Sequence, residues 1–185
     1  MARNHWSHAL ASVVKDKKMC VEEDSRTVTI KDGYPKAKHH YLVLPTPVQT
    51  RGVASLDKTD VALVQHMLRR GEELADRLTA KEPSVKFHFG FHSIPSMVHL
   101  HMHMISQDFD SPKLKNKKHW NSFTTEFFLD AEEVIEQLKR DRKVTVNKQE
   151  AEDLLKQDLT CPRCKAVVSN LPRMKDHYAR CKASP

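Results

Sequence analysis

Three histidines alternate with apolar residues in one short run, His99-Leu-His101-Met-His103-Met-Ile. If the run is a strand, its three imidazoles point to one face and the apolar side chains between them point to the other. Three imidazoles this close repel one another when protonated, so we expect most of them to be neutral at neutral pH. A neutral imidazole can act as a nucleophile, a proton acceptor or a metal ligand. The run therefore predicts a reaction centre or a metal site.

The residues just upstream of the histidine run favour a reaction centre over a metal site. Gly90, His92 and Ser96 offer a backbone amide, an imidazole and a hydroxyl close to the histidine run. Such groups together can surround and stabilise a phosphoryl group during its transfer. Alternate histidines on a strand can also hold zinc, yet no neighbouring carboxylate is placed to orient them. We therefore expect phosphoryl transfer without a catalytic metal, while the metal alternative stays open.

The C-terminal residues carry a second chemical motif, Cys161-x2-Cys164-x12-His177-x3-Cys181. Two cysteines of a tight turn and a His/Cys pair one helical turn apart can converge on one tetrahedral zinc ion. Leu171 and Met174 fall where so small a unit needs apolar residues, and the ion would supply folding free energy that the unit lacks. Because four protein ligands close the site, we expect one structural Zn²⁺ here and no reaction.

Hydrophobic periodicity predicts the elements that position these groups. Period-two alternation indicates strands at residues 26–31, 40–44, 85–91 and 99–105. Apolar residues at helical spacing indicate helices near residues 57–79 and 130–139, with a short one at 4–12 that carries Trp6. The pattern is typical of an α+β fold, in which one long helix covers an antiparallel sheet and a small zinc finger follows. We expect a catalytic domain at residues 1–140, a charged linker or helix at 141–157, and the finger at 158–185.

The composition favours an anionic partner. The 185 residues carry a formal net charge of +7, with a pI near 9.2 and a mean hydropathy of −0.62, and nucleic acid is the leading candidate. No apolar run approaches about 18 residues and the N-terminus resembles no secretory signal, so we expect no membrane partner. The segment Asp108–Trp120 is basic, contains aromatic residues and lacks periodicity, which favours a loop that follows a phosphate backbone. Cys20 lies far from the finger, and we interpret it as a free thiol in a reducing compartment.

These motifs resemble those of a known family. The run from His99 to Ile105 resembles the signature of the histidine triad nucleotide hydrolases and transferases, and the stretch Ile30–Pro45 is similar to that family's first hairpin. The finger and the segment Ser106–Trp120 narrow the resemblance to the branch that acts on adenylated DNA ends. Members of that branch often carry an N-terminal forkhead-associated domain, which we do not expect in this chain. The finger ends in Cys181 where some relatives have histidine, and either residue suits zinc.

The resemblance implies a reaction and a role for each site residue. Its fold would be that of the family's antiparallel sheet, and its reaction would remove AMP from 5′-adenylated nicked or gapped DNA, in single-strand break repair. The middle histidine, His101, would attack the α-phosphorus and carry AMP until water releases it. His99 and His103 would contact phosphate or orient the nucleophile, and His40 would hold the other ring nitrogen of His101 or fix its tautomer. The remaining expected roles are phosphate contact for Ser96, proton donation for His92, and nucleotide binding for Asp32, Lys31 and Ser106.

The same resemblance suggests a DNA-binding surface and leaves alternatives open. The expected DNA contacts are Trp6, which could stack on a base, and Lys36, Lys38, Thr46, Pro47, Val48, Gln49, Thr50, Asp110, Ser111 and Lys118. We expect a nuclear monomer in which deletion of residues 158–185 weakens DNA binding more than hydrolysis of small adenylates. The alternatives are a hydrolase of free dinucleotides or AMP–amine compounds, and a nucleic-acid-binding adaptor with an inactive triad.

Overall fold

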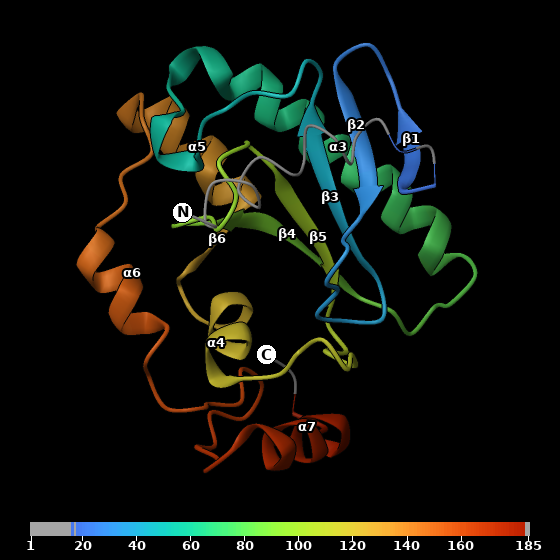
Figure 1. The fold of residues 1–185 in the computed structure, drawn as a ribbon, viewed down its shortest axis with the longest axis vertical. Helices are drawn as coiled ribbons and strands as arrows, with labels where there is room; N and C mark the ends of the chain where they lie inside the picture. Colours follow the sequence, from blue (N-terminus) through green and yellow to red (C-terminus); the bar gives the residue numbers. More distant parts are fainter. Residues whose placement is uncertain (1–15, 17, 184–185) are drawn as a thin grey trace.

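A computed structural model describes residues 16 and 18–183, and within them six strands form one antiparallel sheet (Figure 1). The strand order is β1-β2-β3-β5-β4-β6, which places β5 between β3 and β4 at the centre. The strands are β1 (Cys20–Glu23), β2 (Thr27–Lys31), β3 (His40–Pro45), β4 (Phe87–His92), β5 (Met102–Ser106) and β6 (Phe128–Asp130). The α+β class and the antiparallel sheet are confirmed.

One face of the sheet is covered by helices, as the sequence predicts. Helix α3 (Val61–Thr79) packs on the central strands, and α5 (Ala131–Asp141) packs beside it. A short 3-10 turn, η2 (Lys58–Asp60), leads into α3, and a second one, η1 (Val53–Ser55), precedes it. Asp57 caps η2 and Asp130 caps α5. Their side chains accept hydrogen bonds from backbone amides in the first turn of each helix, which have no partner within the helix. Apolar residues of α3, α5 and the strands form the core between these layers.

The histidine run adopts less strand than its alternation predicts. Strand β5 begins at Met102, so His103 is the only one of the three histidines that lies in a strand. The amide of Leu100 donates to the carbonyl of Gln49 at 2.9 Å and so leaves the sheet ladder. The two faces nevertheless separate as expected, because Leu100, Met102 and Met104 are all buried in the helix-covered core.

The opposite face of the sheet carries a second core, which joins the sheet to the finger. Helix α4 (Lys117–Thr124) and the finger helix α7 (Leu171–Arg180) contribute to this core. Helix α6 (Lys148–Leu154) lies beside α4, since the side chain of Asn121 donates to the carbonyl of Leu154. The apolar residues that meet here are Ile105, Phe109, Leu114, Trp120, Phe123, Phe128, Leu159, Leu171, Met174 and Tyr178. Figure 1 shows α4 between the sheet and the C-terminal helix. The expected apolar roles of Leu171 and Met174 are confirmed.

The expectation of a loop at Asp108–Trp120 is wrong for its last residues. Helix α4 begins at Lys117 inside that segment, and the side chain of Asn116 caps it by accepting from the amide of His119 at 2.9 Å. Trp120 is 0% exposed and its indole N–H donates to the carbonyl of Thr160 at 3.1 Å. Its aromatic ring therefore belongs to the core and cannot stack on DNA bases.

Gly90 lies on β4 where this strand pairs with β6. A Cβ at this position would overlap the carbonyl oxygen of Leu129 and lie 2.6 Å from Cε1 of Phe128, so the backbone of β6 would have to move. We expect Gly90→Ala to lower the free energy of unfolding by about 3 kcal/mol, the cost of forcing an extra group into a packed core. Urea unfolding measures this cost. Gly33→Ala is the matched control, because a Cβ there meets nothing within 4 Å, and equal losses in both variants would contradict the prediction.

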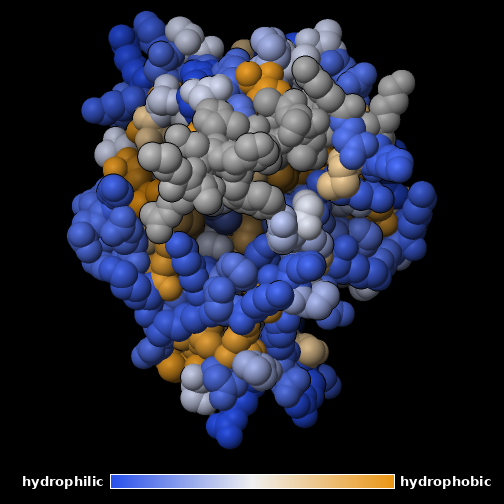
Figure 2. All heavy atoms as spheres, viewed as in Figure 1, coloured by the Kyte–Doolittle hydropathy of each residue, from blue (hydrophilic) through white to orange (hydrophobic). Residues whose placement is uncertain are grey.

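The outer surface is mainly polar on the face shown in Figure 2. One group of apolar residues is visible on this face, in the region between α4 and α7. Among the described residues, no helix combines the length and apolar character needed to cross a bilayer.

Candidate active site and zinc site

The ring of His101 is oriented by the backbone. Its Nδ1 lies 2.7 Å from the carbonyl oxygen of His99, and because a carbonyl only accepts, Nδ1–H must donate. In a neutral ring the proton is then on Nδ1, and Nε2 keeps its lone pair. The side chain is buried, and burial lowers the pKa of His101 from its ordinary value near 6.5. His101 therefore presents a neutral, unprotonated Nε2, which is the form required of a nucleophile.

His40 contacts His103 instead of the nucleophile, so its expected bond to His101 is wrong. The amide of Lys36 donates to Nδ1 of His40 at 3.0 Å, which leaves the proton of His40 on Nε2. That Nε2–H donates to Nδ1 of His103 at 2.9 Å. His103 must then carry its own proton on Nε2. We call Lys36 N–H, His40 and His103 the imidazole relay, and it makes His103 Nε2–H a hydrogen-bond donor.

Asp32 lies beside the middle of this relay. One carboxylate oxygen is 3.5 Å from Nε2 of His40, and the other accepts from the amide of Tyr34 at 2.7 Å. Ligand atoms of Asp32, His40 and His103 all lie within 4.8 Å of one another, a group that could hold a metal ion. The separation of 2.9 Å between the two ring nitrogens is a hydrogen-bond distance, whereas two nitrogens on a tetrahedral Zn²⁺ lie about 3.4 Å apart. The observed distance fits the hydrogen-bonded relay better than a metal site.

His92 differs from His103 in the ring nitrogen that carries the proton. The backbone carbonyl of Ser122 raises the pKa of His92 although burial lowers it overall, and Nε2 of His92 is buried with no partner among the described residues. A carbonyl favours a proton on the ring nitrogen that faces it, which points to Nδ1–H and a lone pair on Nε2. This polarity suits His92 to accept a proton, and its expected role as a proton donor stays a prediction. Nε2 of His103 is also buried without a described partner, so one free acceptor and one free donor lie in the same cluster.

An aromatic side chain that the sequence reading missed closes this cluster. The ring of Phe123, on α4, lies 4.6 Å from His92 and 5.3 Å from both His40 and His103, measured between ring centroids. Phe128 and Phe127 also contact His92, at 6.0 and 5.3 Å. The sequence does contain a signal for helix α4 and its apolar face. Asn116 is a typical helix cap, and Trp120 and Phe123 are three residues apart, which is helical spacing.

Burial keeps these imidazoles neutral. It lowers the pKa of His40 to about 4, and it lowers the pKa of His92 and His103 well below the ordinary value. Asp32 opposes the shift at His40, whereas the positive charge of Lys36 adds to it. All of these rings are therefore uncharged at physiological pH, as expected from the sequence.

The depressed pKa of His40 predicts how stability depends on pH. Between pH 6.5 and about 4, the unfolded chain binds a proton that folded His40 does not, so the free energy of unfolding falls as pH falls through this window. His40 alone should remove about 2 kcal/mol between pH 7 and pH 5. Urea unfolding at both pH values, for the wild type and His40→Gln, isolates this contribution from those of other groups. The variant should lose about 2 kcal/mol less, and equal losses would contradict the assignment.

The other expected phosphate and nucleotide contacts differ in accessibility. Ser96 is exposed on the loop before His99, and Lys31 is exposed at the end of β2, so their roles remain predictions. Ser106 is corrected: it is 0% exposed, and its hydroxyl accepts from the amide of His39 at 2.9 Å and donates to Asp108. Its hydrogen-bonding capacity is used inside the fold, so it cannot bind a nucleotide from solution.

The expected DNA contacts also divide into accessible and buried groups. Ser111 is corrected, because it is buried and its hydroxyl donates to the carbonyl of Pro35 at 2.6 Å. Asp110 and Lys118 are exposed, whereas Lys38 is exposed but paired with Glu82 at 2.7 Å. Trp6 lies outside the described residues. In the turn before η1, the exposed residues are Thr46, Pro47 and Thr50, and the half-buried ones are Val48 and Gln49.

The four finger residues converge on one point. Their ligand atoms lie within 4.8 Å of one another, with 4.0 Å between the sulfurs of Cys161 and Cys181 and 3.1 Å from Cys164 Sγ to His177 Nε2. Two thiolates on a tetrahedral zinc lie about 3.8 Å apart, so the donor set fits Zn²⁺. The backbone amide of Ala166 lowers the pKa of Cys164 to about 7, which favours the thiolate form that binds metal.

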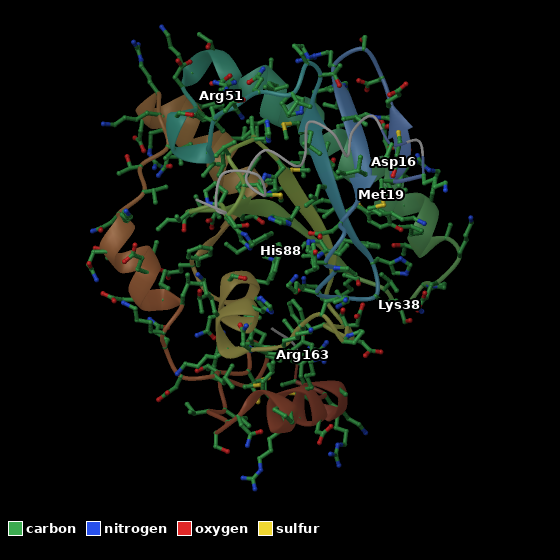
Figure 3. All side chains as sticks on the ribbon, viewed as in Figure 1. Asp16, Met19, Lys38, Arg51, His88 and Arg163 are labelled. Carbon is green, nitrogen blue, oxygen red and sulfur yellow. The ribbon has the colours of Figure 1, made fainter. Side chains whose placement is uncertain are left out.

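Arg163 connects the finger to the sheet domain. Its guanidinium stacks on the ring of Tyr178 at 3.9 Å and donates to the carbonyl of Gln107 at 3.4 Å. Figure 3 labels this residue above the finger helix. The hydroxyl of Tyr178 donates to the carbonyl of Gln107 at 2.9 Å, so finger and sheet are tied by polar as well as apolar contacts.

Sheet, imidazole cluster and finger together define a histidine triad domain joined to a Cys₃His zinc finger. Two family models match the chain: "Scavenger mRNA decapping enzyme C-term binding" over residues 7–119, and "C2HE / C2H2 / C2HC zinc-binding finger" over residues 124–181. The chain belongs to the aprataxin family. It is 50% identical to aprataxin of Gallus gallus over 95% of this chain and 55% of that protein.

Two more distant relatives match this chain over nearly their whole length. The chain is 30% identical to the aprataxin-like protein of Saccharomyces cerevisiae, over 89% of this chain and 90% of that protein. A crystal structure of the aprataxin orthologue Hnt3 in complex with DNA superposes with a TM-score of 0.74 at 22% identity, over 96% of this chain and 93% of that one. The chain spans about half the length of the animal aprataxins of Gallus gallus, Ciona intestinalis and Danio rerio. The expected domain boundaries remain predictions.

Proposed function

We propose that this protein hydrolyses AMP from 5′-adenylated DNA ends through a covalent AMP–histidine intermediate on His101. The observation that supports it most directly is the 2.7 Å bond from Nδ1 of His101 to the carbonyl of His99, because it leaves Nε2 free to attack. Aprataxin relatives and the DNA complex of the Hnt3 orthologue support nucleic acid as the substrate class.

In the first step, Nε2 of His101 attacks the α-phosphorus of the phosphoanhydride. An N–P bond forms, the P–O bond to the 5′-phosphate of DNA breaks, and the DNA leaves with that electron pair. A phosphate is a good leaving group, so this step needs no proton donor. His103 Nε2–H, oriented by the relay, would donate to a non-bridging oxygen as negative charge develops there.

In the second step, water attacks the same phosphorus and the N–P bond breaks. AMP leaves, and His101 recovers its lone pair. His92 is suited to take a proton from the attacking water, because its buried Nε2 is a free acceptor. Ser96 would contact phosphate, and Asp32 with Lys31 would bind the nucleotide. His99 contributes the carbonyl that orients His101.

DNA would lie across the basic surface that runs from α4 to the finger. Lys118 is exposed on α4, and Arg173, Arg180 and Lys182 are exposed on or beside α7. Cations so placed attract a phosphate backbone without reading its sequence. We further propose one structural zinc, no catalytic metal, a monomeric state and a nuclear location.

The test is AMP release from a nicked duplex that carries a 5′-adenylate, with a free dinucleotide and an AMP–amine compound in parallel. EDTA is present for the short assay, and zinc content is measured afterwards to show that the finger kept its ion. Metal-independent release with strong preference for the duplex would support the proposal. Release from the small compounds alone would favour the free-nucleotide hydrolase, and no release with retained DNA binding would favour the adaptor.

A further inference from the structure

Helix α4 is held firmly on its finger side. The indole of Trp120 donates to the carbonyl of Thr160 at 3.1 Å, and its ring meets that of Tyr178 edge-on at 5.3 Å. Asn121 is 1% exposed, and its amide donates to the carbonyl of Gln157 at 2.8 Å, just beyond α6. These contacts leave α4 little freedom to shift or rotate relative to the sheet.

The next turn of the same helix faces the imidazoles. Phe123 is 5% exposed, and its ring plane stands at 88° to that of His40 and 90° to that of His103. Its ring also lies 4.6 Å from that of His92, and the backbone carbonyl of the preceding Ser122 raises the pKa of His92. One helical turn thus contacts both partners in the relay and the free acceptor.

Two of these rings have few polar restraints on their rotation. His103 makes one described hydrogen bond, to His40, and its Nε2 has no described partner. Nε2 of His92 is also buried without a described partner. A side chain with few polar restraints can turn about χ1 and χ2 unless its neighbours block it. Among the described residues, Phe123 is the phenylalanine that contacts all three rings, whereas the neighbouring phenylalanines reach His92 or His103 but not His40.

We infer that Phe123 is a positioning residue, which holds His40, His103 and His92 so that the donor and the acceptor keep their orientation in the reaction. Phe123 itself contacts no reacting atom. Its kinetic consequence rests on the proposed function, but the orientation of the rings does not.

The kinetic test uses a small adenylate, which makes the result independent of DNA binding. Phe123→Leu should lower kcat at least about tenfold while KM changes less than about threefold, because misplaced catalytic groups weaken the transition state more than the ground state. Phe123→Tyr keeps the ring and should recover most of kcat. Leu138→Ala is the control: it truncates a fully buried side chain of α5 in the apolar core on the helix-covered face of the sheet, and should lower Tm at least as much without lowering kcat. If Phe123→Leu lowers Tm but leaves kcat unchanged, the inference is wrong.

A spectroscopic test separates the inference from the proposed function. Imidazole ¹⁵N chemical shifts report which ring nitrogen carries the proton. In the full zinc-loaded chain we expect Nε2–H for His40 and His103 and Nδ1–H for His92. Phe123→Leu should average these signals and Phe123→Tyr should retain them, even if no adenylate is hydrolysed. Unchanged signals in Phe123→Leu would overturn the inference whatever the enzyme assay shows. If Phe123→Leu does not fold, Phe123→Met replaces it in both tests, with the same expected results.

Discussion

Replacing His101 with alanine is expected to lower AMP release from adenylated duplex by about 10⁴-fold or more, and to change the affinity for that duplex by less than about threefold. The large loss follows because the variant lacks the nitrogen that forms the covalent intermediate, so the two easier displacements revert to one difficult hydrolysis. The small change in affinity follows because the ring is buried and contributes no charge to phosphate binding.

Two measurements check this prediction. Single-turnover assays with α-labelled AMP–DNA measure the rate, and denaturing gels of quenched reactions show whether label stays on the protein. His88→Ala is the matched control: His88 lies on neighbouring β4, pairs with Asp130 at 3.1 Å, and is 38% exposed (Figure 3). It should form the labelled intermediate at the wild-type rate. Labelled intermediate in His101→Ala would contradict the assignment of the nucleophile.

The sequence predicts the chemistry of this chain better than its local geometry. The alternation from His99 to His103 correctly separates imidazoles from the apolar core, because that separation depends on burial and holds even where regular strand is absent. The finger ligands are predictable for a similar reason: a metal site demands particular atoms at particular spacings. In both cases the constraint is local in sequence and chemically specific.

The partners of these groups could not be predicted, because they depend on contacts between distant segments. His40 reaches His103 only because β3 pairs with β5, and that register decides which imidazole receives its proton. The carbonyl that raises the pKa of His92 belongs to α4, some thirty residues later. Ser106 and Ser111 look like accessible hydroxyls in the sequence, yet both are used in hydrogen bonds to the segment that precedes β3.

The apolar cluster that the finger shares with the sheet domain changes the expected result of removing the finger. Deleting residues 158–185 should lower the free energy of unfolding by about 5 kcal/mol or more, and AMP release from small adenylates should fall along with DNA binding. The reason is that Leu171, Met174 and Tyr178 cover Trp120 and Phe109, so the deletion exposes aromatic core of the catalytic domain. It also removes the binding free energy of zinc, which contributes to folding.

A variant that removes finger charge without removing core separates the two effects. Arg173 and Lys182 are exposed, and neither belongs to the apolar cluster between finger and sheet. The double variant Arg173→Ala/Lys182→Ala should keep Tm within about 2 °C and keep small-adenylate turnover, while DNA affinity falls and its salt dependence weakens by up to about two phosphate contacts. Thermal unfolding, turnover and salt-dependent DNA binding are measured on the deletion and the double variant together. A deletion that keeps wild-type Tm and small-adenylate turnover would show that the sheet domain is stable without the finger, and that the contacts of Trp120 and Tyr178 contribute little to the catalytic fold.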